Sequence, residues 1–139
     1  MRDIQAYTDE MMAALEDCFQ SFGHDPDEVM PERDKVQAFA ELLVKEGVDL
    51  PAGFEIYSML EGDGIQMEWM DLNGVVLEVN LTNFRGVLHI HADKDDDRFD
   101  CRMLNLEEFG VLKYVSNVLA VAESEGALAL AYQNFVTSR

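Results

Sequence analysis

The chain has 139 residues, with 28 acidic residues against ten basic ones and a formal net charge of −18. This charge argues against direct binding to nucleic acid, which needs a basic face for the phosphates, and against an anionic membrane surface. The length fits a single domain, 1–139, and an apolar content of 48% is enough for a hydrophobic core.

Two amphipathic helices are predicted in a helical layer that covers residues 1–47. The first runs from Ile4 to Phe22, where apolar side chains recur at spacings of three and four, and a glycine follows it. The second comes after Pro31, which suits a first helical turn, and stops at Gly47. Its apolar stripe comprises Val36, Phe39, Ala40 and Leu43.

The helical layer carries most of the negative charge. Residues 1–71 hold 18 acidic and four basic residues, net −14, whereas residues 72–139 hold ten and six, net −4. Acidic side chains form rows on the outward side of the first helix, and an acidic stretch precedes the second helix. We predict that these side chains contact a partner, the candidates being Asp9, Glu10, Glu16, Asp17, Asp27 and Glu28.

Between residues 54 and 104 the apolar pattern changes to alternation, which predicts β-strands. Four turn signals divide this segment into five short strands of an antiparallel meander, and the second turn is predicted as a three-residue loop, Leu72 to Gly74. The alternation gathers apolar side chains on one face, which the helices should cover. This set is Phe54, Ile56, Leu60, Ile65, Met67, Trp69, Val75, Leu77, Val79, Leu81, Leu88, Ile90, Phe99, Cys101 and Met103.

Residues 105–136 are predicted to be helical. Their first apolar stripe is Leu106, Phe109, Leu112, Val115, Val118, Leu119 and Ala122. Gly126 then interrupts the pattern, which resumes as far as Phe135, so one kinked helix and a pair of short helices both remain open. With these helices packed on one face of the sheet, the predicted fold class is α+β.

The predicted register also brings polar side chains together on the other face of the sheet. It places Glu68 opposite Glu78, Glu78 opposite His91 and His91 opposite Asp100, which gives one row across four strands with Tyr57 at its outer end. Facing carboxylates destabilise a sheet, and a bound divalent ion or a charged histidine would relieve them. The candidates for a metal- or pH-sensing site are Glu68, Glu78, His91 and Asp100. A plain solvated face is the alternative.

No catalytic motif stands out, so we expect neither an enzyme nor a cofactor. The acidic run from Asp93 to Asp97 has alternate aspartates like a calcium loop, but it lacks the glycine and the glutamate that an EF-hand requires later in the loop. We expect a solvated hairpin loop there. Cys18 and Cys101 lack metal-ligand spacing and are predicted to be buried, reduced thiols.

Apolar side chains also fall on the supposedly polar face of the sheet. They are Tyr57, Met59, Met70, Val76 and Val87. Because aromatic and methionine side chains are enriched in protein interfaces, we add Tyr57, Met59 and Met70 to the predicted partner-binding residues. The alternative is that the C-terminal segment covers them.

One hairpin of the predicted sheet resembles known sequences. GIQMEW at 64–69 and VLEV at 76–79 are similar to a hairpin of many small, uncharacterised bacterial and phage-borne proteins, in which an I-Q-L-E-W strand follows a turn. That resemblance implies no activity. The size and acidity also resemble type III secretion chaperones, which are small acidic homodimers, but those proteins have a helix where this chain has the predicted turn from Asn83 to Gly86.

The leading hypothesis is a non-enzymatic module that binds a basic protein partner, as nucleic-acid-mimicking inhibitors from phages and mobile elements do, because charge complementarity speeds association and selects partners. The alternatives are a small acidic homodimeric secretion or assembly chaperone and a metal- or pH-sensing protein. Whether the chain forms a homodimer remains open. The N-terminus lacks the apolar stretch of a secretion signal, and no apolar run approaches the roughly 20 residues of a membrane span, so we expect a cytoplasmic protein.

Overall fold

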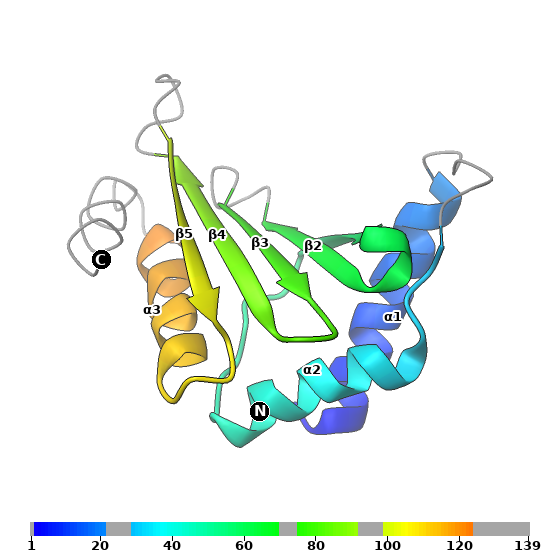
Figure 1. Ribbon diagram of the computed structural model, residues 1–139, viewed down its shortest axis with the longest axis horizontal. Coiled ribbons are helices and arrows are strands. Elements are labelled where there is room, and N and C mark those ends of the chain that lie inside the picture. Colours follow the sequence, from blue (N-terminus) through cyan, green and yellow to red (C-terminus); the bar gives the residue numbers. More distant parts are fainter. Residues whose placement is uncertain (1, 22–28, 70–74, 92–98, 124–139) are drawn as a thin grey trace.

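The computed structural model describes residues 2–21, 29–69, 75–91 and 99–123. The helices in these ranges are α1 (Ile4–Ser21), α2 (Arg33–Lys45) and α3 (Val111–Glu123). The strands are β1 (Glu55–Met59), β2 (Gly64–Trp69), β3 (Val75–Asn80), β4 (Arg85–His91) and β5 (Phe99–Asn105), and a short 3-10 helix, η1 (Leu60–Gly62), joins β1 to β2. The fold is α+β, as predicted (Figure 1).

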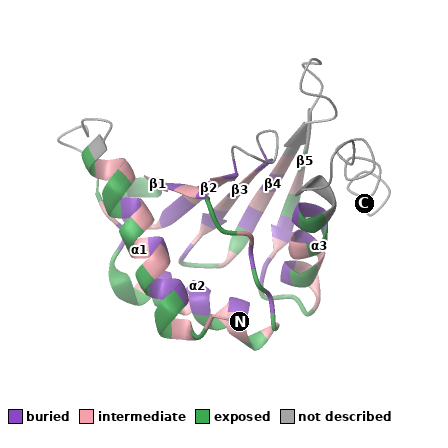
Figure 2. Cartoon of the chain, turned by 180° about the vertical axis from the view of Figure 1, so that it is seen from behind, coloured by how far each residue is buried: buried purple, intermediate pink, exposed green. Residues whose placement is uncertain are grey.

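The N-terminal helices bury their predicted apolar stripes. In α2 the buried side chains are Val36, Phe39, Ala40 and Leu43, and in α1 they include Tyr7, Met11 and Leu15 (Figure 2). The end of α2 also lies as predicted, because Gly47 adopts a φ of 67° and the Val48 amide donates to the Leu43 carbonyl at 2.9 Å. Each large apolar side chain buried in this way contributes roughly 1.5–3 kcal/mol.

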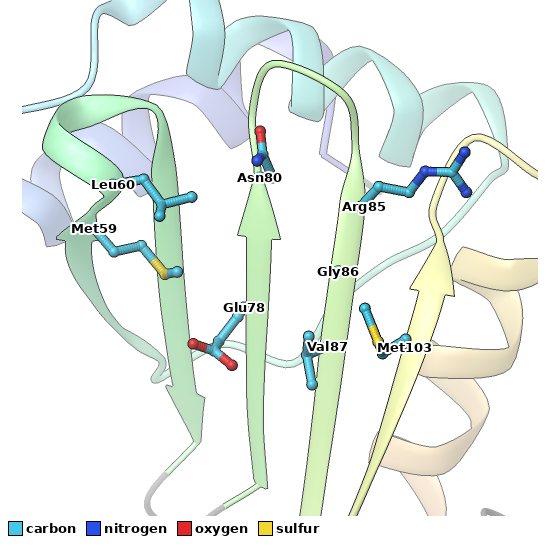
Figure 3. A pocket seen from close by; sticks show the side chains of 8 residues that line it. All are labelled: Met59, Leu60, Glu78, Asn80, Arg85, Gly86, Val87 and Met103. Carbon is cyan, nitrogen blue, oxygen red and sulfur yellow. The ribbon is translucent and has the colours of Figure 1, made fainter.

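The five strands form an antiparallel meander in the order β1-β2-β3-β4-β5. The helices lie behind the strands in Figure 3, which looks onto the opposite face of the sheet. We call that opposite face the outer face. Its described side chains are Glu55, Tyr57, Met59, Gln66, Glu68, Val76, Glu78, Asn80, Arg85, Val87, His89, Cys101 and Met103.

Tyr7 connects α1 to the segment between α2 and β1. Its buried hydroxyl accepts a hydrogen bond from the Leu50 amide at 2.9 Å and donates one to the Val48 carbonyl at 2.8 Å. The Arg2 guanidinium lies 4.8 Å from the centroid of the Tyr7 ring, on a side chain that also forms an ion pair with Asp49. This segment therefore packs against α1 through a polar contact as well as through apolar ones.

Four side chains that were predicted to be buried are exposed. They are Leu60, Cys101, Met103 and Phe109. Leu104 of β5 is buried, and so is Leu106, which follows the strand and whose amide donates to the Phe84 carbonyl at 2.9 Å. The sequence offers apolar residues at odd and at even positions of β5 and the turn after it, and the even set, with Leu104 and Leu106, is the one that is buried.

The predicted three-residue loop between β2 and β3, Leu72 to Gly74, lies outside the described residues, but the register of the two strands that flank it is not the predicted one. Trp69 pairs with Val75, so the register differs by two residues from the one that this loop would give. A slip of two residues keeps every side chain on its face, whereas a slip of one would not. The alternation therefore identified the apolar face correctly in β2 and β3 without determining which residues pair.

The β3–β4 connection is a turn, as the sequence predicted. The Phe84 amide donates to the Asn80 carbonyl at 2.8 Å across this turn. It does not contain the helix found at this position in type III secretion chaperones. Within the described ranges, no helix combines the length and apolar character that crossing a membrane requires.

Candidate functional site

The outer face is built from two adjacent rows of cross-strand neighbours. One row is Glu55, Glu68, Val76, His89 and Cys101, and the other is Tyr57, Gln66, Glu78, Val87 and Met103. Carboxylates gather at the β1–β2 side of these rows, whereas apolar side chains prevail toward β5. The face therefore divides into an acidic region and an apolar region.

The predicted row of Glu68, Glu78, His91 and Asp100 is not formed. Their register partners include Val76 for Glu68, Val87 for Glu78, Phe99 for His91 and Ile90 for Asp100. Asp100 moreover belongs to the alternating set opposite to that of His91. Among the residues that the structure describes, no three histidine, cysteine or acidic side chains could hold a metal ion together. The predicted aspartate loop at 93–97 lies outside the described residues.

Glu78 has a histidine neighbour, but it is His89 rather than His91. The His89 Nε2 atom lies 2.6 Å from the Glu78 Oε2 atom, and both side chains are partly buried. This contact is diagonal, because the register neighbour of Glu78 on β4 is Val87. The sequence pattern supplied the two residue types and the correct face, and the register decided which histidine reaches the carboxylate.

The acidic region of the outer face contains Glu55 and Glu68. Together with Asp17 of α1, whose charge acts on the same Cys18 thiol as theirs, we call these three carboxylates the acidic edge. Glu55 and Glu68 are direct cross-strand neighbours, an arrangement that normally destabilises a sheet. Tyr57 donates a hydrogen bond to Glu55 at 2.7 Å, and Gln66 donates one to Glu68 at 2.7 Å. These neutral donors solvate the carboxylates without cancelling their charge, and no described lysine, arginine or histidine forms an ion pair with any of the three.

The negative potential of the acidic edge acts on two neighbouring groups. The hydrogen bond to Glu55, then burial and the Glu55 and Glu68 charges raise the pKa of Tyr57 well above its ordinary value. Burial raises the pKa of the Cys18 thiol, and the charges of Glu55, Asp17 and Glu68 add to that effect. Asp17 of α1 and the two strand carboxylates therefore act on one shared region of space.

Replacing Tyr57 with Phe should reduce the decrease in the free energy of unfolding at alkaline pH. A raised phenol pKa contributes stability below the unfolded-state value of about 10, and this contribution is lost as the pH rises beyond it. The free energy of unfolding, measured with denaturant between about pH 8 and about pH 11, should fall more steeply in the wild type than in Tyr57→Phe. Glu55→Gln should also flatten the curve. Equal slopes in all three proteins would contradict this account.

The apolar region contains a shallow pocket of about 170 Å³. It is lined by Met59, Leu60, Glu78, Asn80, Arg85, Gly86, Val87 and Met103 (Figure 3). Figure 3 shows the two methionines on opposite sides, with Arg85 and Asn80 at one end and Glu78 toward the other. Methionine side chains adapt to the shape of a guest, so the pocket is suited to an apolar group.

Turns in unusual backbone conformations hold the rim of the pocket. Leu60 and Glu61 both have a φ of 55°, as does Phe84, which precedes Arg85. The Leu81 amide donates to the Asp63 carbonyl at 2.7 Å and so ties the two turns together. Non-glycine residues in this region cost about 1–3 kcal/mol each and concentrate at functional sites.

The structure sorts the predicted partner-binding residues into groups. Two form ion pairs within the chain, Glu10 with Arg2 at 2.6 Å and Asp9 with Arg33. Glu16 and Asp17 are exposed and form no ion pair with a described residue. Tyr57 belongs to the outer face beside the acidic edge, and Met59 lines the pocket. The remaining three, Asp27, Glu28 and Met70, lie outside the described residues.

Sequence reasoning missed part of both regions. It assigned Leu60 and Met103 to the core, although both line the pocket, and it gave Arg85 only a place in a turn. The Glu55–Glu68 pair was missed because it depends on the β1–β2 register. Gly62 and Gly64 indicate a turn between β1 and β2. The sequence did not indicate that Leu60 and Glu61 adopt the left-handed backbone conformation in this turn, in which Leu60 is exposed.

Comparisons of the chain with protein-family models, with curated proteins and with solved structures find no match.

Proposed function

We propose that this protein is a non-enzymatic interaction module that binds a basic segment of a protein partner at the acidic edge. The observation that carries the proposal is the direct pairing of Glu55 with Glu68, neither of which has an ion-pair partner among the residues that the structure describes. Such a pair costs stability in the free protein. A lysine or arginine from a partner would relieve it, so part of the binding free energy comes from removing a repulsion.

The distribution of charge elsewhere supports this surface over the rest of the helical layer. Arg2, Arg33 and Lys35 already form ion pairs with carboxylates of the same chain. Those carboxylates are partly neutralised, whereas the three carboxylates of the acidic edge have no ion-pair partner among the described residues. The net charge of −18 also raises the rate of encounter with a basic partner.

Affinity capture from a lysate of the source cells tests the proposal, with the wild type and Glu55→Lys/Glu68→Lys as parallel baits. The matched control is Asp34→Lys/Glu41→Lys, which changes the net charge equally at exposed positions of α2. We expect proteins that the wild type and the control retain, that the acidic-edge variant loses, and that about 0.5 M salt releases, because the Debye length then falls to a few ångströms.

Retention of the same proteins by the acidic-edge variant would overturn the proposal. So would a captured set that is insensitive to salt. Duplex DNA added to the lysate separates two classes of partner, because a partner that uses its phosphate-binding surface will be displaced and one that uses another basic surface will not. The first result would support the nucleic-acid-mimic form of the hypothesis, and the second would exclude it.

A further inference from the structure

Phe109 is the most exposed large apolar side chain among the described residues, with 91% of its surface accessible. It lies in the turn between β5 and α3. This turn is ordered by hydrogen bonds, from the Glu108 amide to the Asn105 carbonyl at 3.1 Å and from the Val111 amide to the Glu108 carbonyl at 3.2 Å. The chain therefore presents an aromatic ring to solvent on a defined support, a feature typical of interfaces.

The pocket on the outer face has the size and lining to accept such a ring. An apolar cavity of about 150 Å³ holds one benzene molecule, and this pocket measures about 170 Å³. Met103, 82% exposed, forms one of its walls, and Leu60, 50% exposed, lies on the other side. Both side chains would lose apolar surface to a bound ring.

The charges around the ring and the pocket are complementary. Glu107 and Glu108 directly precede Phe109, are exposed, and form no ion pair with a described residue. Arg85, at the end of the pocket, is exposed and likewise has no described carboxylate partner. A ring that enters the pocket would bring its preceding carboxylates toward this guanidinium.

Phe109 and six of the eight residues that line the pocket belong to the less acidic half of the chain, and the other two, Met59 and Leu60, are uncharged. Residues 72–139 carry a net charge of −4, against −14 for residues 1–71. Arg85 pairs in register with Asn105, which precedes the turn that carries Phe109, so Phe109 and the pocket lie at the same end of the sheet. Two copies that meet through this surface bring fewer acidic side chains together than two copies that meet through the helical layer.

We propose that two copies of the chain associate about a two-fold axis, each inserting Phe109 into the outer-face pocket of the other. Glu107 and Glu108 of one copy then lie beside Arg85 of its partner. Each copy supplies one Phe109 ring and one pocket, which is the self-complementary arrangement that a closed dimer requires. The proposal uses a different surface from the acidic edge and goes beyond the proposed function.

Sedimentation equilibrium of the purified full chain tests this inference. The wild type should approach twice its monomer mass of 15.7 kDa as concentration rises. Phe109→Ser removes two buried rings from each dimer, so its dissociation constant should rise about a hundredfold or more. At concentrations low enough for both proteins to be monomeric, its thermal unfolding should match that of the wild type, because the side chain is exposed in the monomer. A wild type that stays monomeric up to about 1 mM would overturn the proposal, as would a Phe109→Ser variant that dimerises like the wild type.

Mixing two deficient variants tests the reciprocal exchange. Met103→Asp keeps the ring and damages the pocket, whereas Phe109→Ser keeps the pocket and lacks the ring. An equimolar mixture should form a heterodimer through one intact contact, more tightly than either variant alone. A mixture that associates no more tightly than either variant alone would contradict the insertion of Phe109 into the pocket, and with it the proposed dimer.

Charge reversal tests the contact beside the pocket. Arg85→Glu and Glu108→Arg should each weaken the dimer, and the double variant should recover part of the loss. Glu41→Arg, an exposed control on α2, should not weaken it. Additive losses in the double variant would contradict this contact. Glu55→Lys/Glu68→Lys should dimerise normally, so a failure of the acidic-edge proposal and a failure of the dimer are distinguishable.

Discussion

Tyr7→Phe is expected to lower the free energy of unfolding by about 2–4 kcal/mol. The substitution removes the hydroxyl that accepts from the Leu50 amide and donates to the Val48 carbonyl. Tyr7 is 1% exposed, so water cannot readily replace the lost oxygen. Both backbone groups then remain buried without their partner, and each such group costs about 1–3 kcal/mol. Urea unfolding followed by circular dichroism measures the difference.

Thr8→Val is the matched control for this substitution. Thr8 is also fully buried in α1, and its hydroxyl donates to the Ile4 carbonyl at 2.7 Å. That carbonyl is already placed to accept within the helix, so the loss should stay below about 1 kcal/mol. Equal losses for the two variants would show that the Tyr7 hydroxyl does not hold the connecting segment specifically. Burial raises the pKa of Tyr7, so its contribution should persist below about pH 10 and disappear above it.

Gly86→Val is expected to cost about 2–3 kcal/mol and to reshape the floor of the pocket. A Cβ atom at this position would lie 2.9 Å from the Glu78 carbonyl oxygen and 3.1 Å from the Leu106 Cδ1 atom. The first neighbour is the backbone of β3 and cannot move without disturbing the sheet. Thermal unfolding measures the stability, and sedimentation measures the loss of dimer that a displaced pocket floor should cause.

Val87→Ile is the control on the same strand. Val87 occupies the outer face and is partly exposed, so the additional methyl group has room and the stability should change by less than about 0.5 kcal/mol. If Gly86→Val were tolerated equally well, the close approach of β4 to β3 at this point would be wrong.

The helices illustrate what local pattern can predict. The stripe of Val36, Phe39, Ala40 and Leu43 and the stop at Gly47 appear in the structure where the sequence placed them. Helical periodicity depends on residues three and four positions apart, and the glycine requirement depends on one backbone angle. Both are local properties, so no knowledge of distant residues was needed.

The sheet shows which features a local sequence pattern cannot predict. Alternation predicted the covered face of β2 and β3, but two registers that differ by two residues place the same side chains on that face. The cross-strand neighbour of Glu68 is therefore Val76 and not the predicted Glu78. In β5, apolar residues occupy both alternating sets, and only the docking of Leu104 and Leu106 in the core decided which set faces the helices.

The candidate binding surfaces, too, were predictable from the sequence only in part. The amino-acid sequence by itself determined the α+β architecture, the net charge of −18 and its concentration in the first half of the chain. Only the tertiary structure decided that Glu55 faces Glu68, and that Met103 and Phe109 are exposed while Arg2 and Arg33 neutralise part of α1. Net charge follows from composition, and helices and strands follow from the spacing of apolar residues a few positions apart. A binding surface depends instead on contacts between residues far apart in the chain, and strand register and core packing determine those contacts.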